Sequence, residues 1–153
     1  MVEGEQALLA QWESLKKEER DEKNEENSLL DGVPRALPAL QQAHTYGIRV
    51  ARVGFDWPDV TGVVDKVREE IAELEAAETP KEVEAELGDL LFAVTNWARH
   101  LDVDPETALR LANARFAGRF GALEGLVRQR GLDLAQMTID EMEALWQEVK
   151  RNE

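Results

Sequence analysis

The sequence contains no cysteine, which excludes a disulfide framework and thiolate chemistry. It has only two histidines, His44 and His100, and neither belongs to a metal-binding motif, so a zinc site built on nitrogen or sulfur ligands is excluded as well. No apolar run approaches the roughly 20 residues of a membrane-spanning helix, and the N-terminal residues lack the apolar core of a signal peptide. We therefore expect a cytoplasmic protein with no membrane partner.

Basic residues are scarce relative to acidic ones. The chain has 18 lysines and arginines against 32 aspartates and glutamates, a formal net charge of −14. This balance argues against a nucleic-acid partner, because a surface that binds the phosphate backbone is basic. A small phosphate-bearing ligand is still compatible with the charge, since a bound metal ion inverts the local sign. The length of 153 residues, with 43% hydrophobic and 33% charged residues, fits a globular, helix-rich domain.

Apolar residues recur with helical periodicity in six segments, and no stretch alternates long enough to form a sheet. The predicted helices cover approximately 5–23, 38–53, 59–78, 80–101, 105–130 and 140–151. We divide the chain into residues 1–31, an N-terminal helix with a flexible connection, and residues 32–153, a helical domain. The sequence therefore predicts an all-α fold, a helical bundle of five or six helices.

Several helix boundaries are marked by capping residues. Asp104 has the chemistry of an N-cap, and Thr138 and Glu141 have the spacing of a capping box. Gly54 and Gly131 would end the helices that precede them. The loop after Gly54 also carries two aromatic residues, which would either plug the core or form a wall for a nucleotide base or sugar; these are Phe55 and Trp57.

Acidic residues are concentrated between residues 65 and 89, where ten acids stand against three bases, a net charge of −7. This stretch reads as two helices joined at residues 79–80, and each helix carries a pair of carboxylates three residues apart. The pairs are Glu70 with Glu73, and Glu86 with Asp89. Residues three apart share one helix face, so if the helices fold back on each other the four carboxylates point into one gap. Such a gap repels itself unless cations fill it.

A helical projection separates these four acids from their neighbours. Glu70 lies at the edge of the apolar stripe of its helix and Glu73 lies just beyond it, whereas Glu69 falls on the solvent side. Glu86 and Asp89 lie together on one flank of the stripe of the next helix. Ligands that are all oxygen favour Mg²⁺, with Mn²⁺ as a substitute. We interpret the acids as a metal site that handles a polyphosphate; the alternative is a merely solvated, charged hairpin.

Arginines become frequent further along the chain. Residues 99–130 contain six arginines against four acids. Arg115 and Arg119 are four residues apart on the same side of their helix, a spacing that suits a bidentate grip on phosphate oxygens. Ion pairs with the acidic hairpin are an equally good interpretation of these two side chains.

Together these motifs resemble MazG-type nucleoside triphosphate pyrophosphohydrolases. The resemblance starts from the acidic motifs EEIAE at Glu69–Glu73 and ELGD at Glu86–Asp89, and it continues over residues 35–40, 53–57, 88–101, 111–120 and 142–151. It covers most of the chain, which is most similar to the C-terminal half of two-domain MazG proteins. Residues 5–23 resemble the segment that connects their two halves.

The resemblance implies an all-α fold that assembles as a homodimer or higher homo-oligomer, with helices paired between subunits. It also implies Mg²⁺-dependent cleavage of a nucleoside triphosphate between the α- and β-phosphates, which yields a nucleoside monophosphate and pyrophosphate. By position, it implies four metal-binding catalytic residues: Glu70, Glu73, Glu86 and Asp89. It implies five substrate-binding residues: Arg115, Arg119, Trp146, Lys150 and Lys16. Glu70 or Glu73 would accept the proton of the attacking water.

The sequence departs from the family pattern at basic positions. Glu82 stands where a lysine is often found, and Thr45 and Ile48 also replace frequent lysines. The expected role is nucleotide-pool control or house-cleaning. Two alternatives are a helical dimerisation or regulatory module with a weak or inactive site, and a pyrophosphatase that is narrowly specific for dUTP or dCTP.

Overall fold

The computed structural model describes residues 28–153, and this part of the chain is helical without a β-strand. The elements are α2 (Ala39–Ala51), α3 (Val60–Ala76), α4 (Pro80–His100), α5 (Pro105–Gln129), the 3₁₀ turn η1 (Leu134–Gln136) and α6 (Ile139–Arg151). The predicted all-α fold with five or six helices is thereby confirmed. The helix predicted at residues 5–23, and Lys16 within it, lie outside the described residues.

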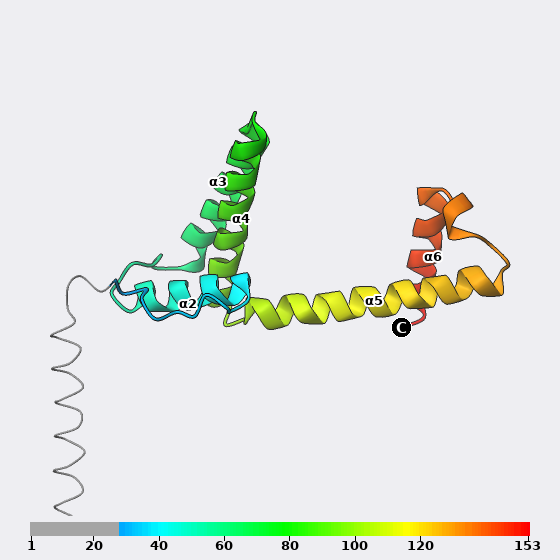
Figure 1. The fold of residues 1–153 in the computed structure, drawn as a ribbon, viewed down its shortest axis with the longest axis horizontal. Coiled ribbons are helices and arrows are strands. Elements are labelled where there is room, and N and C mark those ends of the chain that lie inside the picture. The colour runs from blue at the N-terminus through cyan, green and yellow to red at the C-terminus, as the bar shows by residue number, and fades with distance from the viewer. Residues whose placement is uncertain (1–27) are drawn as a thin grey trace, which may run out of the picture.

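The helices form an elongated molecule (Figure 1). α3 and α4 fold back on each other as a long antiparallel hairpin, and α2 crosses the base of that hairpin. α5 then runs away from the hairpin for 25 residues, or roughly 38 Å at 1.5 Å per residue. α6 turns back and packs on the far end of α5. Within residues 28–153, no helix combines the length and apolarity needed to cross a bilayer.

The capping signals act as the sequence predicts. The side chain of Asp104 accepts a hydrogen bond from the backbone N–H of Thr107 at 2.7 Å, and Thr138 with Glu141 forms a complete capping box. Gly54 and Gly131 have φ angles of 86° and 65°, in the left-handed region that favours glycine after a helix end. These caps place both ends of α5 and the start of α6.

Burial is concentrated in two small clusters rather than in one bundle core. At the far end of α5, four residues form a buried cluster between α5 and α6: Leu123, Val127, Leu145 and Val149. At the other end, Val63 and Val67 of α3 and Ala93 of α4 are buried. The hairpin and the α5–α6 unit therefore each bury their own apolar side chains.

The apolar stripe predicted for α4 does not form a core within the chain. Its side chains are between 41% and 55% exposed at Val83, Leu87, Leu91, Val94 and Leu101. Within residues 28–153, α4 buries only the smaller side chains of Ala93 and Thr95, which lie on different sides of the helix, and leaves these larger side chains uncovered. The stripe of α5 is likewise open at Phe116, which is 60% exposed. Open apolar stripes of this extent are typical of a surface that another protein covers.

Candidate functional site

Three of the predicted metal ligands meet between the two arms of the hairpin. Glu70 and Glu73 come from α3, and Glu86 comes from α4. Each offers one carboxylate oxygen, and these oxygens all lie within 4.8 Å of one another. The meeting follows from the sequence, because the three-residue spacing aligns the α3 pair on one face and the antiparallel turn brings α4 alongside.

The fourth predicted ligand, Asp89, stands slightly apart. It lies three residues beyond Glu86 on α4, which is about one helical turn, and it is exposed. It does not belong to the group of three close carboxylates. The structure therefore brings three of the four acids together and places the fourth one turn further along the same helix.

Glu70 is the buried member of the group. The residue is 4% exposed, and its Oε2 is buried without a hydrogen-bond partner among residues 28–153. An unpartnered buried carboxylate oxygen is costly, and native structures rarely keep one without a ligand, water or ion. The all-oxygen donor set beside it fits a hard divalent cation such as Mg²⁺ or Mn²⁺. The residues present therefore fit the metal that the sequence predicts, with Glu70, Glu73 and Glu86 as the residues that would hold it.

Lys66 provides positive charge at this cluster. Its Nζ lies 2.6 Å from Oε1 of Glu70 and 3.2 Å from Oε1 of Glu69. The hydrogen bond to Glu70 raises the pKa of Lys66 above its ordinary value, so the amine is protonated. The sequence analysis missed this residue, although a lysine four positions before a glutamate is a recognisable helical pair. Glu69 lies on the solvent side as predicted, with a side chain that is 55% exposed.

The cluster also changes the acidity of Glu73. Partial removal from water, and then the negative charges of Glu70, Glu69 and Glu86, raise the pKa of Glu73 above its ordinary value. Glu73 is exposed overall, so its removal from water is only partial. The other cause, repulsion by the neighbouring carboxylates, exists only because the cluster brings these acids together. A carboxylate with a raised pKa is a stronger base than an ordinary glutamate, which is relevant to proton transfer.

An acidic groove continues from the cluster to the tip of the hairpin. It has a volume of about 390 Å³. Its lining is Glu73, Ala76, Ala77, Glu78, Glu82 and Glu86. Glu82 is held there by the helix start, since its Oε2 accepts hydrogen bonds from the backbone N–H groups of Glu78 and Thr79, each at 3.0 Å.

Three of the five predicted substrate-binding residues line a second groove, of about 380 Å³, between α5 and α6. Arg115, Arg119 and Trp146 line it together with Phe116, whose ring centroid lies 5.4 Å from that of Trp146. Arg119 makes two hydrogen bonds to the carboxylate of Glu153, at 2.8 and 2.7 Å. Its ion pair is therefore with the end of the chain and not with the acidic hairpin. Lys150 is exposed in the last turn of α6, four residues after Trp146.

The two grooves do not meet within one chain. The acidic hairpin rises from one end of α5, and α6 packs on the other end (Figure 1). The second groove lies near the middle of α5, whereas Glu86 lies about 21 Å along α4 from the end of that helix at His100. A single chain therefore does not bring the predicted metal ligands and the predicted phosphate-binding arginines together.

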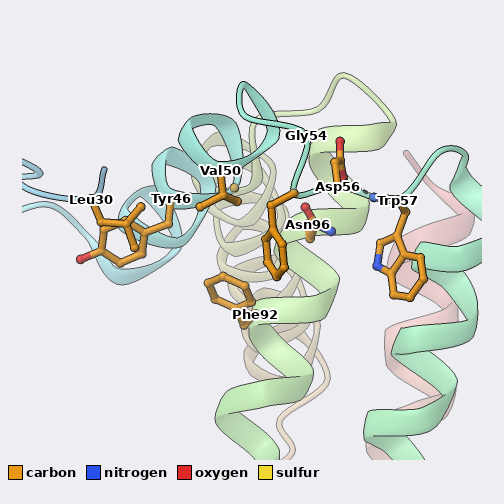
Figure 2. Close-up of a pocket in the computed structure, with 10 residues that line it drawn as sticks. Leu30, Tyr46, Val50, Gly54, Asp56, Trp57, Phe92 and Asn96 are labelled. Carbon is orange, nitrogen blue, oxygen red and sulfur yellow. Dashed lines mark hydrogen bonds between the residues drawn. The ribbon is translucent and has the colours of Figure 1, made fainter. Parts of the chain in front are cut away.

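A third cavity, of about 490 Å³, lies between α2, the loop that follows it, and α4 (Figure 2). Both aromatic residues of the loop line it, with Tyr46, Phe92 and Asn96. Trp57 also packs against α3, because a Cβ atom added at Gly62 would lie 2.8 Å from its ring. Phe55 is 79% exposed and Trp57 is 47% exposed. The two alternatives for this loop, a plug over the core and a wall for a base or sugar, stay predictions.

Sequence reasoning also missed the ion pair that anchors this loop. Arg99 donates to both carboxylate oxygens of Asp56, and Nε2 of His100 lies 2.8 Å from Oδ1 of the same carboxylate. Hydrogen bonding by Arg99, outweighing the opposing effect of burial, lowers the pKa of Asp56 to about 2. The sequence signal for this ion pair is an acid, Asp56, between two aromatic residues of a loop. The sequence does not indicate its partners, because they lie 43 and 44 residues further along the chain.

Comparison with known proteins gives two findings. Residues 42–115 match the family model described as phosphoribosyl-ATP pyrophosphohydrolase. Over 157 aligned residues the chain is 46% identical to the nucleoside triphosphate pyrophosphohydrolase of Escherichia coli strain K12, covering 99% of this chain and 59% of that protein. It is 40% identical over 140 residues to the nucleoside triphosphate pyrophosphohydrolase/pyrophosphatase MazG of Thermotoga maritima, covering 92% of this chain and 54% of that protein. The chain matches a MazG-type domain.

This MazG-type domain spans between half and two thirds of the length of those two relatives. The resemblance predicted from the sequence motifs is confirmed by these matches. Residues 42–115 contain all four predicted metal ligands as well as Arg115, whereas Arg119, Trp146 and Lys150 lie beyond them. The family model thus covers the whole acidic hairpin, together with most of α2 and the first part of α5.

Proposed function

We propose that this MazG-type domain hydrolyses nucleoside triphosphates to nucleoside monophosphates and pyrophosphate, with Mg²⁺ as cofactor. The observation that carries the proposal is the unpartnered, buried oxygen of Glu70 inside a group of three carboxylates. The names of the relatives, which are pyrophosphohydrolases of nucleoside triphosphates, support the substrate class. Such an activity would serve nucleotide-pool control or the removal of unwanted nucleotides.

The chain's own residues have separable tasks in this proposal. Glu70, Glu73 and Glu86, with Asp89 one turn away, would hold the metal, which when bound would polarise the phosphate and lower the pKa of a water molecule. Glu73 is also the better placed of the two candidate general bases, because it is the exposed member of the group. Glu70 is less suited to that task, since it is buried and paired with Lys66.

The phosphate-binding residues reach the metal site from a second copy of the chain. Within one chain the arginine groove lies near the middle of α5, away from the carboxylates between α3 and α4. A dimer that covers the exposed stripes of α4 and α5 removes apolar surface from water and gives each hairpin a neighbouring groove. In that arrangement Arg115 and Arg119 neutralise charge on the leaving pyrophosphate, and Trp146 and Lys150 hold the nucleotide.

The site assignment is tested by substitutions with matched controls. Glu73→Ala and Asp89→Ala should each lower the release of pyrophosphate by about a hundredfold or more, within the range seen when general-base catalysis is removed. Glu75→Ala and Glu84→Ala remove exposed acids from the same two helices and should leave the rate unchanged. Undiminished pyrophosphate release in both Glu73→Ala and Asp89→Ala would overturn the assignment.

A further inference from the structure

Lys66 occupies a position next to the acid cluster that no part of the proposed reaction uses. Its ammonium group contacts Oε1 of Glu70 at 2.6 Å, while Oε2 of the same carboxylate has no partner. The side chain of Lys66 is 38% exposed, whereas that of Glu70 is 6% exposed. The lysine therefore reaches from the solvent side into a buried acidic position.

A cation is required at this position whether or not metal is bound. A buried carboxylate without a counter-charge is strongly unfavourable, and here the charges of Glu73 and Glu86 add repulsion. Lys66 is the cationic side chain that satisfies Glu70, with Glu69 as its second contact. An ammonium group is compact and carried on a flexible chain, so it can leave the carboxylate without any movement of the backbone.

We propose that Lys66 is a built-in counter-ion of the acid cluster, which stabilises the hairpin in the absence of metal and is displaced from Glu70 when Mg²⁺ binds. This inference rests on the proposed function, because it takes the cluster to be the metal site. Its consequence is a competition: a divalent cation on the free Oε2 of Glu70 would lie beside the ammonium group on Oε1, and repulsion between the two cations opposes their binding to one carboxylate at the same time. The lysine thereby weakens metal affinity and keeps the empty site folded.

Lys66→Met is the direct test, because methionine keeps a similar length and removes the charge. In the absence of metal, the midpoint of thermal unfolding should fall by about 5 °C, as expected for the loss of a charge-assisted hydrogen bond. Saturating Mg²⁺ should restore most of that loss. Calorimetric titration with MgCl₂ should show Mg²⁺ affinity increased about tenfold over the wild type.

Arg68→Met is the matched control. It removes the same charge two residues away on α3, from an exposed ion pair with Asp65. A general change in electrostatic field should affect both variants alike and should fade in ~0.5 M salt, where the Debye length is about 4 Å. Displacement at Glu70 predicts instead that only Lys66→Met gains affinity, and that the gain persists at high salt.

If Lys66→Met alone does not fold, a double variant tests the same proposal. Adding Glu70→Gln neutralises the buried carboxylate, so the double variant should be more stable than Lys66→Met alone in metal-free buffer. Unchanged Mg²⁺ affinity in Lys66→Met, or a double variant no more stable than the single one, would overturn the counter-ion proposal alone. A wild-type protein that binds no Mg²⁺ would overturn the metal site as well.

Discussion

Glu70 is the buried acid of the cluster: it lies at the edge of the apolar stripe of α3 and is 4% exposed. Which acids meet was predictable, because helical spacing decides which side chains share a face. The contact between Lys66 and Glu70 was also predictable, because the two residues are four apart on one helix. The depth to which Glu70 is buried was not predictable. Burial depends on how α3 packs against α4, and one helix's periodicity does not contain that information.

Asp56 gives a prediction about pH at the same scale. Its folded-state pKa of about 2 lies below the ordinary value of 3.8, so its ion pair stabilises the fold above about pH 4. That contribution is lost as the pH falls towards 2, where the carboxylate becomes protonated. We expect Asp56→Asn to lower the free energy of unfolding by about 1–2 kcal/mol at pH 6. Urea denaturation at a series of pH values measures the difference from wild type, which should shrink towards pH 2. A difference independent of pH would contradict the ion-pair account.

At the scale of elements, the start of α4 explains a residue that the sequence analysis treated only as a departure. Glu82 replaces a frequent lysine, and its carboxylate closes the hairpin turn through the backbone N–H groups of Glu78 and Thr79. These hydrogen bonds from the backbone lower the pKa of Glu82. In turn, the backbone N–H of Glu82 donates a hydrogen bond to Oγ1 of Thr79, at 3.2 Å, which completes a capping box. Glu82 therefore caps the start of α4.

The capping box of Thr79 and Glu82 should contribute to the stability of the hairpin. Thr79→Ala removes the side-chain oxygen that accepts from Glu82 and should lower the free energy of unfolding by about 1 kcal/mol. Chemical denaturation measures the change, and Thr61→Ala is a suitable control, because Thr61 contributes only its backbone N–H to the Asp59 cap of α3. Equal losses in the two variants would show that the box adds nothing beyond helix propensity.

Helix positions were predictable for the described residues, but the faces that these helices bury were not. Local signals such as Asp104 and Gly131 place the ends of α5 within one residue of the prediction. The larger side chains of the α4 stripe were expected in a core and are open instead, because residues 28–153 supply no element to cover them. Periodicity identifies an apolar face, yet it does not distinguish a neighbour in the same chain from one in another chain.

At the scale of the whole molecule, the separation of the two grooves makes a prediction that activity measurements can test. If each site combines the acids of one copy with the arginines of another, two inactive variants should complement each other. Asp89→Ala and Arg119→Ala should each be impaired alone. Random exchange of subunits would make about half of the dimers hybrids, each with one intact site of two. The mixture should therefore show about a quarter of the wild-type activity.

The complementation experiment requires the two variants to be co-expressed or mixed under conditions that allow subunits to exchange. Asp89→Ala mixed with Glu73→Ala is a suitable control, since both changes affect the acidic hairpin. In hybrids of Asp89→Ala with Glu73→Ala, every site keeps one damaged acid, so activity should not recover. Recovery in neither mixture, with exchange demonstrated, would contradict a site shared between two copies.

The most direct test of the central claim is the identity of the products. The wild-type protein is incubated with a panel of ribonucleoside and deoxyribonucleoside triphosphates, including dUTP and dCTP, in Mg²⁺ or in EDTA. Anion-exchange chromatography then separates mono-, di- and triphosphates, and pyrophosphate and orthophosphate are quantified. The account predicts nucleoside monophosphate and pyrophosphate in equal amounts, in Mg²⁺ alone. Nucleoside diphosphate with orthophosphate, or no turnover of any triphosphate in Mg²⁺, would contradict it.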